Sequence, residues 1–331
     1  MLAVLTSIQP PTESVHTLLR CLEANHAELI VIGDRKGPAE YPLRGVQFFS
    51  LEAQLASGFR LALALPTGHY ARKNLGYLIA IQQHPVCIYE TDDDNAPNGF
   101  WRPRSLRAPA VKIRPRPWVN VYRMFSNANI WPRGFPLDLL RDPDTFRRDE
   151  TGPDEIDAPI QQGLANLSPD VDAIWRLVLD RDFAFERKDS VWLPPQTWCP
   201  FNSQTTWWWP QAYPLLYLPS YCSFRMTDIW RGFVAQRCLW ELGYGLVFHP
   251  PEVDQQRNVH SFIRDFEDEV PGYLHNRRIV EALGALNLRS GAEKVSENLR
   301  TCYEELVRIA VIPERELQLV DAWLEDLADI R

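Results

Sequence analysis

The chain has 331 residues, a formal net charge of −8, 45% hydrophobic residues and 24% charged residues. These values are typical of an ordinary soluble globular protein with one large domain or two smaller ones. The negative charge argues against a nucleic-acid-binding protein, which normally carries a basic surface. No stretch approaches about 18 apolar residues, so the sequence predicts no membrane span.

The beginning of the chain and its cysteines indicate a compartment. Met1 to Thr6 are mostly apolar and follow no basic segment, so we expect a first strand there and not a signal peptide. The six cysteines are scattered without CxxC spacing, which argues against a zinc site and a disulfide framework. We therefore expect a cytoplasmic protein, and expect any attachment to a membrane to be peripheral.

The first hundred residues alternate between strand and helix patterns. We expect strands at Leu2–Leu5, Glu28–Ile32, Val46–Phe49 and Val86–Tyr89, and helices at 12–24 and Tyr70–Gln83. Thr12 is a candidate N-cap for the first helix. Such alternation predicts a parallel sheet whose faces are covered by helices. Ligands of these sheets bind at the carboxyl ends of the strands.

The rest of the chain predicts an exposed loop, a helix, a short strand and a helical tail. These lie at 141–158, Asp228–Leu242, Leu246–Phe248 and from His260 onward, with breaks at Gly291 and Pro313. We divide the chain into a domain at 1–260 and a C-terminal helical subdomain at 261–331. The tail is also a candidate element for homo-oligomerisation.

Aromatic residues gather between Trp192 and Trp240, and they include Trp207, Trp208 and Trp209. We interpret most of them as core residues. The alternative is a carbohydrate-facing cleft, because the C–H faces of sugars pack well on aromatic rings.

Three consecutive carboxylates, Asp92, Asp93 and Asp94, follow the last of the early apolar runs. Unit charges about 4 Å apart repel by about 4 kcal/mol at an effective dielectric constant near 20, so this triplet needs compensation. Mg²⁺ or Mn²⁺ carrying a phosphate is the usual partner of such oxygen ligands. The alternative interpretation is a solvated acidic turn.

Several segments in the region of residues 30–265 resemble, in the same order, the STELLO-type glycosyltransferases. They are Val31–Lys36, Arg72–Tyr77, Ile88–Asn95, Asn202–Thr206, Phe224–Gly232 and Gly245–Pro251. A more distant similarity to the plant UDP-arabinopyranose mutases rests on the triplet and on Trp131–Pro136, Gln162–Leu164, Pro169–Ala173 and Asp228–Trp230. Both resemblances imply an α/β GT-A-type fold for nucleotide-diphospho-sugar transferases, with the C-terminal helices as an extension. The tail beyond about residue 270 lies outside the resemblance.

The resemblance implies a nucleotide-sugar donor, with UDP as the expected nucleotide, a Mn²⁺ or Mg²⁺ ion, and a glycan or other hydroxyl acceptor. We expect Asp92 and Asp94 to face the metal, because alternate residues of an extended segment share a side. Asp93 is then expected at the ribose or the sugar. His249 is the candidate that completes the metal shell, and His260 is its alternative.

Basic and polar residues near the first strands are further candidates. Arg72 and Lys73 precede the acidic strand, and we expect them to face the diphosphate or the triplet. Their alternative role is an exposed basic helix end. Asp34 and Lys36 follow the second strand, where a GT-A domain receives the nucleoside, and otherwise form an ordinary polar turn.

Asp228 begins a predicted helix, where it is either an N-cap or the general base for the acceptor hydroxyl of an inverting transferase. Trp230 is expected to line the sugar site, and Arg231 is a weaker candidate for phosphate contact. Arg133 aligns with the arginine that the mutases glycosylate on themselves. We favour the interpretation that Arg133 binds a phosphate or a carboxylate.

The sequence therefore predicts a metal-dependent glycosyltransferase. The first alternative is a UDP-sugar pyranose/furanose mutase that glycosylates itself. The second is a non-catalytic protein that keeps the fold and acts by association. The sugar, the acceptor and the stereochemistry stay open.

Overall fold

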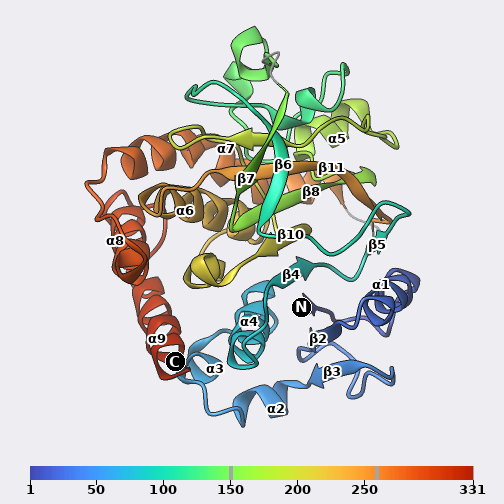
Figure 1. Ribbon diagram of the computed structural model, residues 1–331. Coiled ribbons are helices and arrows are strands. Elements are labelled where there is room, and N and C mark those ends of the chain that lie inside the picture. The colour runs from blue at the N-terminus through green and yellow to red at the C-terminus, as the bar shows by residue number, and fades with distance from the viewer. Residues whose placement is uncertain (149–151, 258–260, 331) are drawn as a thin grey trace.

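The computed structural model describes residues 1–148, 152–257 and 261–330. Within these ranges, eleven strands form one sheet with helices on both faces (Figure 1). The strand order is β3-β2-β1-β4-β10-β8-β11-β9-β6-β7, and β5 pairs with β11. This mixed α/β architecture, with helices after the sheet, agrees with the predicted fold class.

The strands are β1 Leu2–Thr6, β2 Glu28–Ile32, β3 Val46–Phe49, β4 Ile88–Thr91, β5 Asn95–Pro97, β6 Arg107–Lys112, β7 Pro153–Asp157, β8 Ile160–Leu167, β9 Val191–Leu193, β10 Thr205–Trp208 and β11 Leu246–Gln255. The α-helices are α1 Glu13–Ala24, α2 Leu51–Leu55, α3 Arg60–Ala64, α4 Lys73–Gln82, α5 Ala173–Leu179, α6 Thr227–Glu241, α7 Phe262–Ala285, α8 Val295–Arg308 and α9 Glu316–Asp329.

The first four strands run parallel, as the alternating pattern predicted. Thr12 caps α1, and its hydroxyl accepts a hydrogen bond from the amide of Val15. The strand before the triplet begins at Ile88, two residues later than predicted. Val86 is 74% exposed there, so it lies outside the buried part of the sheet.

Alternate residues of the first strands enter two different cores. In β1, Val4 joins the cluster that holds α4 and α6, whereas Ala3 and Leu5 join the cluster that holds α1. Strands buried on both faces read as continuous apolar runs, which explains the uninterrupted hydrophobic sequence of β1 and β2. The sheet is therefore the middle layer of three.

Gly76 allows α4 to pack very closely on the sheet. A Cβ atom at this position would lie 2.6 Å from Val4 Cγ1 and 2.9 Å from Ile32 Cγ1, which is too close for any side chain. This contact fixes the first turns of α4 against β1 and the end of β2, close to the candidate site.

Two predicted boundaries are corrected. Residues 153–157 form β7, a polar edge strand paired with β6, so 141–158 is not simply a loop; residues 149–151 of it are not described. The short strand predicted at Leu246–Phe248 continues to Gln255 through Pro250 and Pro251. Its pairing with β8 shifts register at Pro251, and prolines are tolerated at such bulges.

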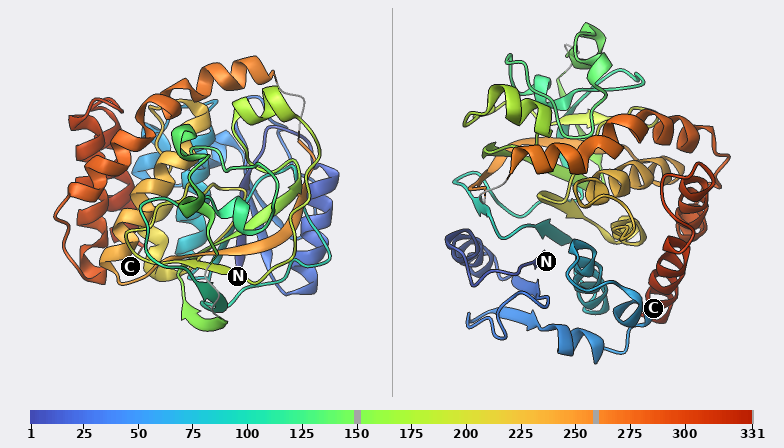
Figure 2. Two further views of the ribbon diagram at one scale, coloured as in Figure 1. Left: turned by 90° about the horizontal axis from the view of Figure 1, so that it is seen from above. Right: turned by 180° about the vertical axis from the view of Figure 1, so that it is seen from behind.

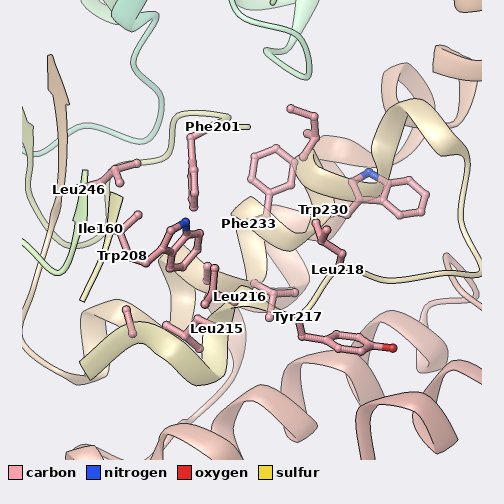
Figure 3. Packing of buried hydrophobic residues seen from close by; sticks show 14 of the residues in the cluster. Ile160, Phe201, Trp208, Leu215, Leu216, Tyr217, Leu218, Trp230, Phe233 and Leu246 are labelled. Carbon is pink, nitrogen blue, oxygen red and sulfur yellow. The ribbon is translucent and has the colours of Figure 1, made fainter. Parts of the chain in front are cut away.

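The tryptophan-rich region is core, as the first interpretation held. Trp207, Trp208 and Trp209 are buried, and Trp230 is only 2% exposed. Trp208 packs beside Phe201, and Trp230 lies further along the same core (Figure 3).

The predicted helical tail is confirmed, and its breaks at Gly291 and Pro313 fall between helices. Helix α7 packs on α5 and α6, α8 packs on α6, and α9 packs on α3 (Figure 2). One hydrophobic cluster contains residues of the sheet, α4, α6 and all three tail helices. The division at residue 260 stays a prediction. Among the described residues, no helix is long and apolar enough to cross a membrane.

Candidate functional site

Lys73 neutralises Asp92 at the end of β4. The lysine side chain is fully buried, and its Nζ donates to Asp92 Oδ1 at 2.9 Å, to Thr91 O at 2.6 Å and to Tyr70 Oη at 2.9 Å. These three bonds use every hydrogen of the ammonium group. Lys73 therefore faces the triplet, as one of its predicted roles required, and holds Asp92 in place.

The other two carboxylates of the triplet diverge. Asp94 accepts from Gln255 Nε2 at 3.0 Å and from Asn95 Nδ2 at 3.1 Å. Burial, followed by the nearby charge of Asp92, raises the pKa of Asp94 to about 7. Asp93 instead accepts from Ser7 Oγ at 2.5 Å, at the end of β1.

Asp92 and Asp94 offer the oxygen ligands that a divalent cation prefers. Both hydrogen bonds to the Asp94 carboxylate come from neutral amides, which leave its charge uncompensated. Among the described residues, no three His, Cys, Asp or Glu side chains gather as a complete metal site. Mg²⁺ needs only one or two carboxylates when substrate phosphates and water complete its shell, and the pair fits such a site.

His249 is not brought to the triplet. Its ring nitrogens bond Gln161 Oε1 at 2.8 Å and Ser190 Oγ at 2.7 Å inside the sheet. Gln255, which contacts Asp94, lies six residues further along β11, roughly 20 Å away at about 3.3 Å per residue. His260 lies outside the described residues.

A chain of polar contacts joins Asp92 to Asp228. Tyr70 Oη donates to Asp92 Oδ1 at 2.9 Å and lies 2.5 Å from Ser203 Oγ, which reaches Asp228 Oδ2 at 3.4 Å. Sequence reasoning missed Tyr70 and Ser203 as site residues. A signal existed for Ser203, because it lies in a segment, Asn202–Thr206, that carried the family resemblance.

Arg133 lies between two carboxylates. Its Nε and Nη2 donate to Asp170 at 2.8 and 2.9 Å, and its Nη1 and Nη2 donate to Asp228 at 3.0 and 2.9 Å. Nη1 also donates to the carbonyl of Arg225. All five N–H groups of the guanidinium are therefore used, as in the favoured interpretation of a carboxylate-binding arginine. Sequence reasoning missed Asp170, although it lies in the segment Pro169–Ala173.

Asp228 is an ionised buried carboxylate. Burial acts to raise its pKa, but Arg133 and, more weakly, Arg231 and Arg225 hold it below its ordinary value. A general base works best with a pKa near the operating pH, so this environment disfavours proton abstraction by Asp228. Helix α6 begins at Thr227, and Asp228 lies in its first turn, so it is not the N-cap.

Trp230 and Arg231 point into the protein. Trp230 Nε1 donates to Asn276 Oδ1 of α7 at 2.9 Å, so its polar edge is directed at the tail helices. Arg231 pairs with buried Glu90 at 3.1 Å and lies over the ring of Trp208. The structure thus places both residues in the core, where they support α6 from behind.

Arg72 is also internal, whereas the end of β2 is accessible. Arg72 donates to Gln54 Oε1 at 2.7 Å and to carbonyls of the segment around α3. The carboxylate of Asp34 accepts from the amides of Arg35 and His69 at 2.7 and 3.0 Å. Lys36 is exposed beside it. Asp34 and Lys36 thus remain candidates for nucleoside contact.

Comparison with known proteins supports one family. Residues 225–331 match the family model described as STELLO glycosyltransferases. Two Arabidopsis thaliana proteins, described as probable glycosyltransferases STELLO1 and STELLO2, are 29% and 28% identical over 96% and 98% of this chain. The chain spans only 43% and 44% of their lengths. The predicted resemblance to the STELLO type is confirmed.

The comparison also corrects one expectation. The match to the family model runs to residue 331, so the helical tail lies within the resemblance and not outside it. Among solved structures, one described as the crystal structure of a mycobacterial protein aligns with 95% of this chain and 75% of its own. Its TM-score of 0.38 and identity of 10% are too low to inform the function.

Proposed function

We propose that this chain, which is similar to the STELLO glycosyltransferases, transfers a sugar from a nucleotide-sugar donor, with UDP as the nucleotide, to an acceptor hydroxyl. The observation that carries the proposal is the polar chain from Asp92 through Tyr70 and Ser203 to Asp228. This series of polar contacts begins at the carboxyl end of β4, and sheets of this class bind ligands at that edge.

We place the donor diphosphate beside Asp92 and Asp94, which would hold Mn²⁺ or Mg²⁺. Such a cation, when bound, neutralises the charge that develops on a departing nucleotide diphosphate. The protein orients both carboxylates: Lys73 and Tyr70 fix Asp92, and Gln255 fixes Asp94.

The remaining residues divide between the two substrates. Asp34 follows β2, and Asp93 accepts from Ser7 at the end of the adjacent strand β1, so we assign both carboxylates to the nucleoside. Arg133 fixes the carboxylate of Asp228, which in turn accepts from the backbone amide of Ser203 at 3.4 Å. Because the pKa of Asp228 is lowered, we assign to it the positioning of Ser203 more readily than proton abstraction.

Asp94→Asn is the sharpest test of the metal–diphosphate assignment. Asp92 is a poor choice for substitution, because its loss would leave the buried ammonium of Lys73 without its carboxylate. With Mn²⁺ present, UDP should raise the melting temperature of the wild-type protein. Loss of one charged ligand should weaken that binding roughly tenfold or more. Asp157→Asn, at an exposed edge strand, is the matched control and should bind UDP normally.

Two results would contradict the proposal. Equal Mn²⁺-dependent UDP affinity in Asp94→Asn and wild type would exclude Asp94 as a metal ligand. Absence of stabilisation by UDP and by every UDP-sugar tried would favour the non-catalytic protein that acts by association.

A further inference from the structure

An open pocket of about 710 Å³ lies beside the triplet, at the carboxyl ends of β8 and β11. It shares a wall with Asp94: Gln255 Nε2 donates to its Oδ2 and the amide of Gln256 donates to its carbonyl, both at 3.0 Å. Arg176, Arg181 and Arg257 also line the pocket.

Arg176 is the buried cation of this pocket. The residue is 4% exposed, and its Nη2 donates to Ser168 Oγ at 2.8 Å and to Pro169 O at 2.6 Å. Its Nε has no hydrogen-bond partner in the described part of the chain. The carboxylate of Asp180 lies 4.0 Å from Nη1 and is itself more than half exposed to solvent.

The other charges nearby do not neutralise Arg176. Arg257 is paired with Asp265 at 2.6 Å, and Arg225 is paired with Glu269 at 2.8 Å. Asp180 and Asp182 lie on the exposed rim of the pocket, beside Arg181. Burial and then the charge of Arg257 lower the pKa of Arg176 to about 10, while the charges of Asp170 and Asp180 act in the opposite direction. Asp170 is itself paired with Arg133.

The position of the pocket distinguishes it from the donor site. Asp34 and Ser7 lie at the ends of β2 and β1, on one side of β4, whereas the pocket lies at the ends of β8 and β11, on the other side. A ligand in the pocket and a nucleotide at β1 and β2 would therefore approach the triplet from opposite directions.

We propose that this pocket is a subsite for an oxyanion, a phosphate or a carboxylate, on the acceptor, with Arg176 as its central ligand and Arg181 and Arg257 at its sides. Both hydrogens of Arg176 Nη2 are donated within the protein, so Nη1 is the nitrogen that would donate a charge-assisted hydrogen bond to either anion. That the bound anion belongs to the acceptor rests on the proposed function. That the pocket binds an anion at all does not depend on the proposed function.

The test uses two probes, inorganic phosphate and D-glucuronate, titrated calorimetrically into the full chain with and without UDP and Mn²⁺. We expect at least one probe to bind, and to bind equally well when UDP is present. Arg176→Gln and Arg181→Gln should each weaken that binding roughly tenfold, because each removes a charge-assisted hydrogen bond, and should leave UDP binding unchanged. Arg107→Gln, an exposed arginine on β6, is the matched control.

The outcomes separate the two proposals. If neither probe binds, or if UDP displaces the bound probe, the acceptor subsite is wrong. If a probe binds and UDP does not, the anion subsite stands and the proposed donor is wrong. Arg181 is exposed, so its variant stays informative should Arg176→Gln fail to fold, and Arg176→Lys should regain part of the affinity by restoring the charge.

Discussion

Asp92 and Asp94 differ in how the protein treats their charge. Asp92 receives a buried ammonium, whereas Asp94 receives amides. A buried charge is costly unless it is paired, so the protein supplies partners wherever no ligand is expected. The two buried arginines differ in the same way. Arg133 is paired with two carboxylates, whereas the nearest carboxylate to Arg176 is 4.0 Å away. The unbalanced groups, Asp94 and Arg176, are therefore the two at which we propose that a metal–diphosphate and an acceptor anion bind.

Arg133 should not become glycosylated. All five of its N–H groups are hydrogen-bonded and its side chain is 6% exposed, so no nitrogen is available to attack a sugar. After incubation with UDP-sugars and Mn²⁺, mass spectrometry of peptides containing Arg133 should show no added sugar. A sugar adduct mapped to this residue would revive the mutase alternative.

Asp172 should make stability depend on pH. Burial raises its pKa from 3.8 to about 6, so between these values the folded protein binds more protons than the unfolded chain. Its contribution to stability is therefore largest below about pH 4 and is lost as the pH rises through about 6, by about 3 kcal/mol in full. Asp172→Asn should lack this dependence.

Urea unfolding at about pH 4 and about pH 7 checks this expectation. Other titrating groups are common to both proteins and cancel in the difference between wild type and Asp172→Asn. The variant should gain stability relative to wild type at the higher pH. A difference that does not change with pH would contradict the raised pKa.

At the scale of elements, the sequence predicted best where its periodicity was strong and its ends were marked. Helix α1 has its cap at Thr12, and β2 and β3 have their predicted bounds. It predicted worst where a strand depends on its partners in the sheet. The polar strand β7 gains its structure from pairing with β6, and β11 continues through Pro250 and Pro251 because β8 holds it on one side. Such pairings are not encoded locally.

Helix α3 should depend on a carboxylate from α9. No side chain of its own caps α3, and Asp326 accepts from the amides of Arg60 and Leu61 at 3.0 and 2.9 Å. Asp326→Ala should cost about 1–2 kcal/mol of unfolding free energy, the usual cost of losing a cap. Asp329→Ala removes a solvent-exposed ion pair to the same arginine and should cost less than Asp326→Ala, because exposed ion pairs contribute little to stability. Equal losses in urea unfolding would contradict the capping role.

At the scale of the whole molecule, the tail helices complete the core of the sheet domain. Trp323 of α9 donates to Pro214 O, and buried Glu316 accepts from Tyr217 Oη and the amide of Ser220. A hydrogen bond from the indole of Trp230 to Asn276 likewise joins α6 to α7. The bond from Trp230 connects the tail to the helix that carries Asp228, and therefore to the candidate site.

A fragment of residues 1–260 should not fold stably. Removal of α7–α9 would expose the apolar faces of α6 and α3 and would leave the indole of Trp230 without its partner. Its near-ultraviolet circular dichroism should be weak, and limited proteolysis should cleave it rapidly, whereas the full chain should resist. A fragment with cooperative urea unfolding would support the predicted boundary at residue 260.

The sequence by itself determined the early parallel strands, the helical tail, the family resemblance and the acidic triplet, because each has a local signature of periodicity, composition or motif. Only the tertiary structure decided which charged side chains are paired inside the protein. In the sequence, Lys73, Arg72 and Arg133 are equally good candidates for phosphate ligands. In the structure, each of them is buried and bonded to groups of the protein itself. The contact of Asp92 with Asp228 through Tyr70 and Ser203, and the pocket at Arg176, arise from segments far apart in the chain that the sheet brings to one edge.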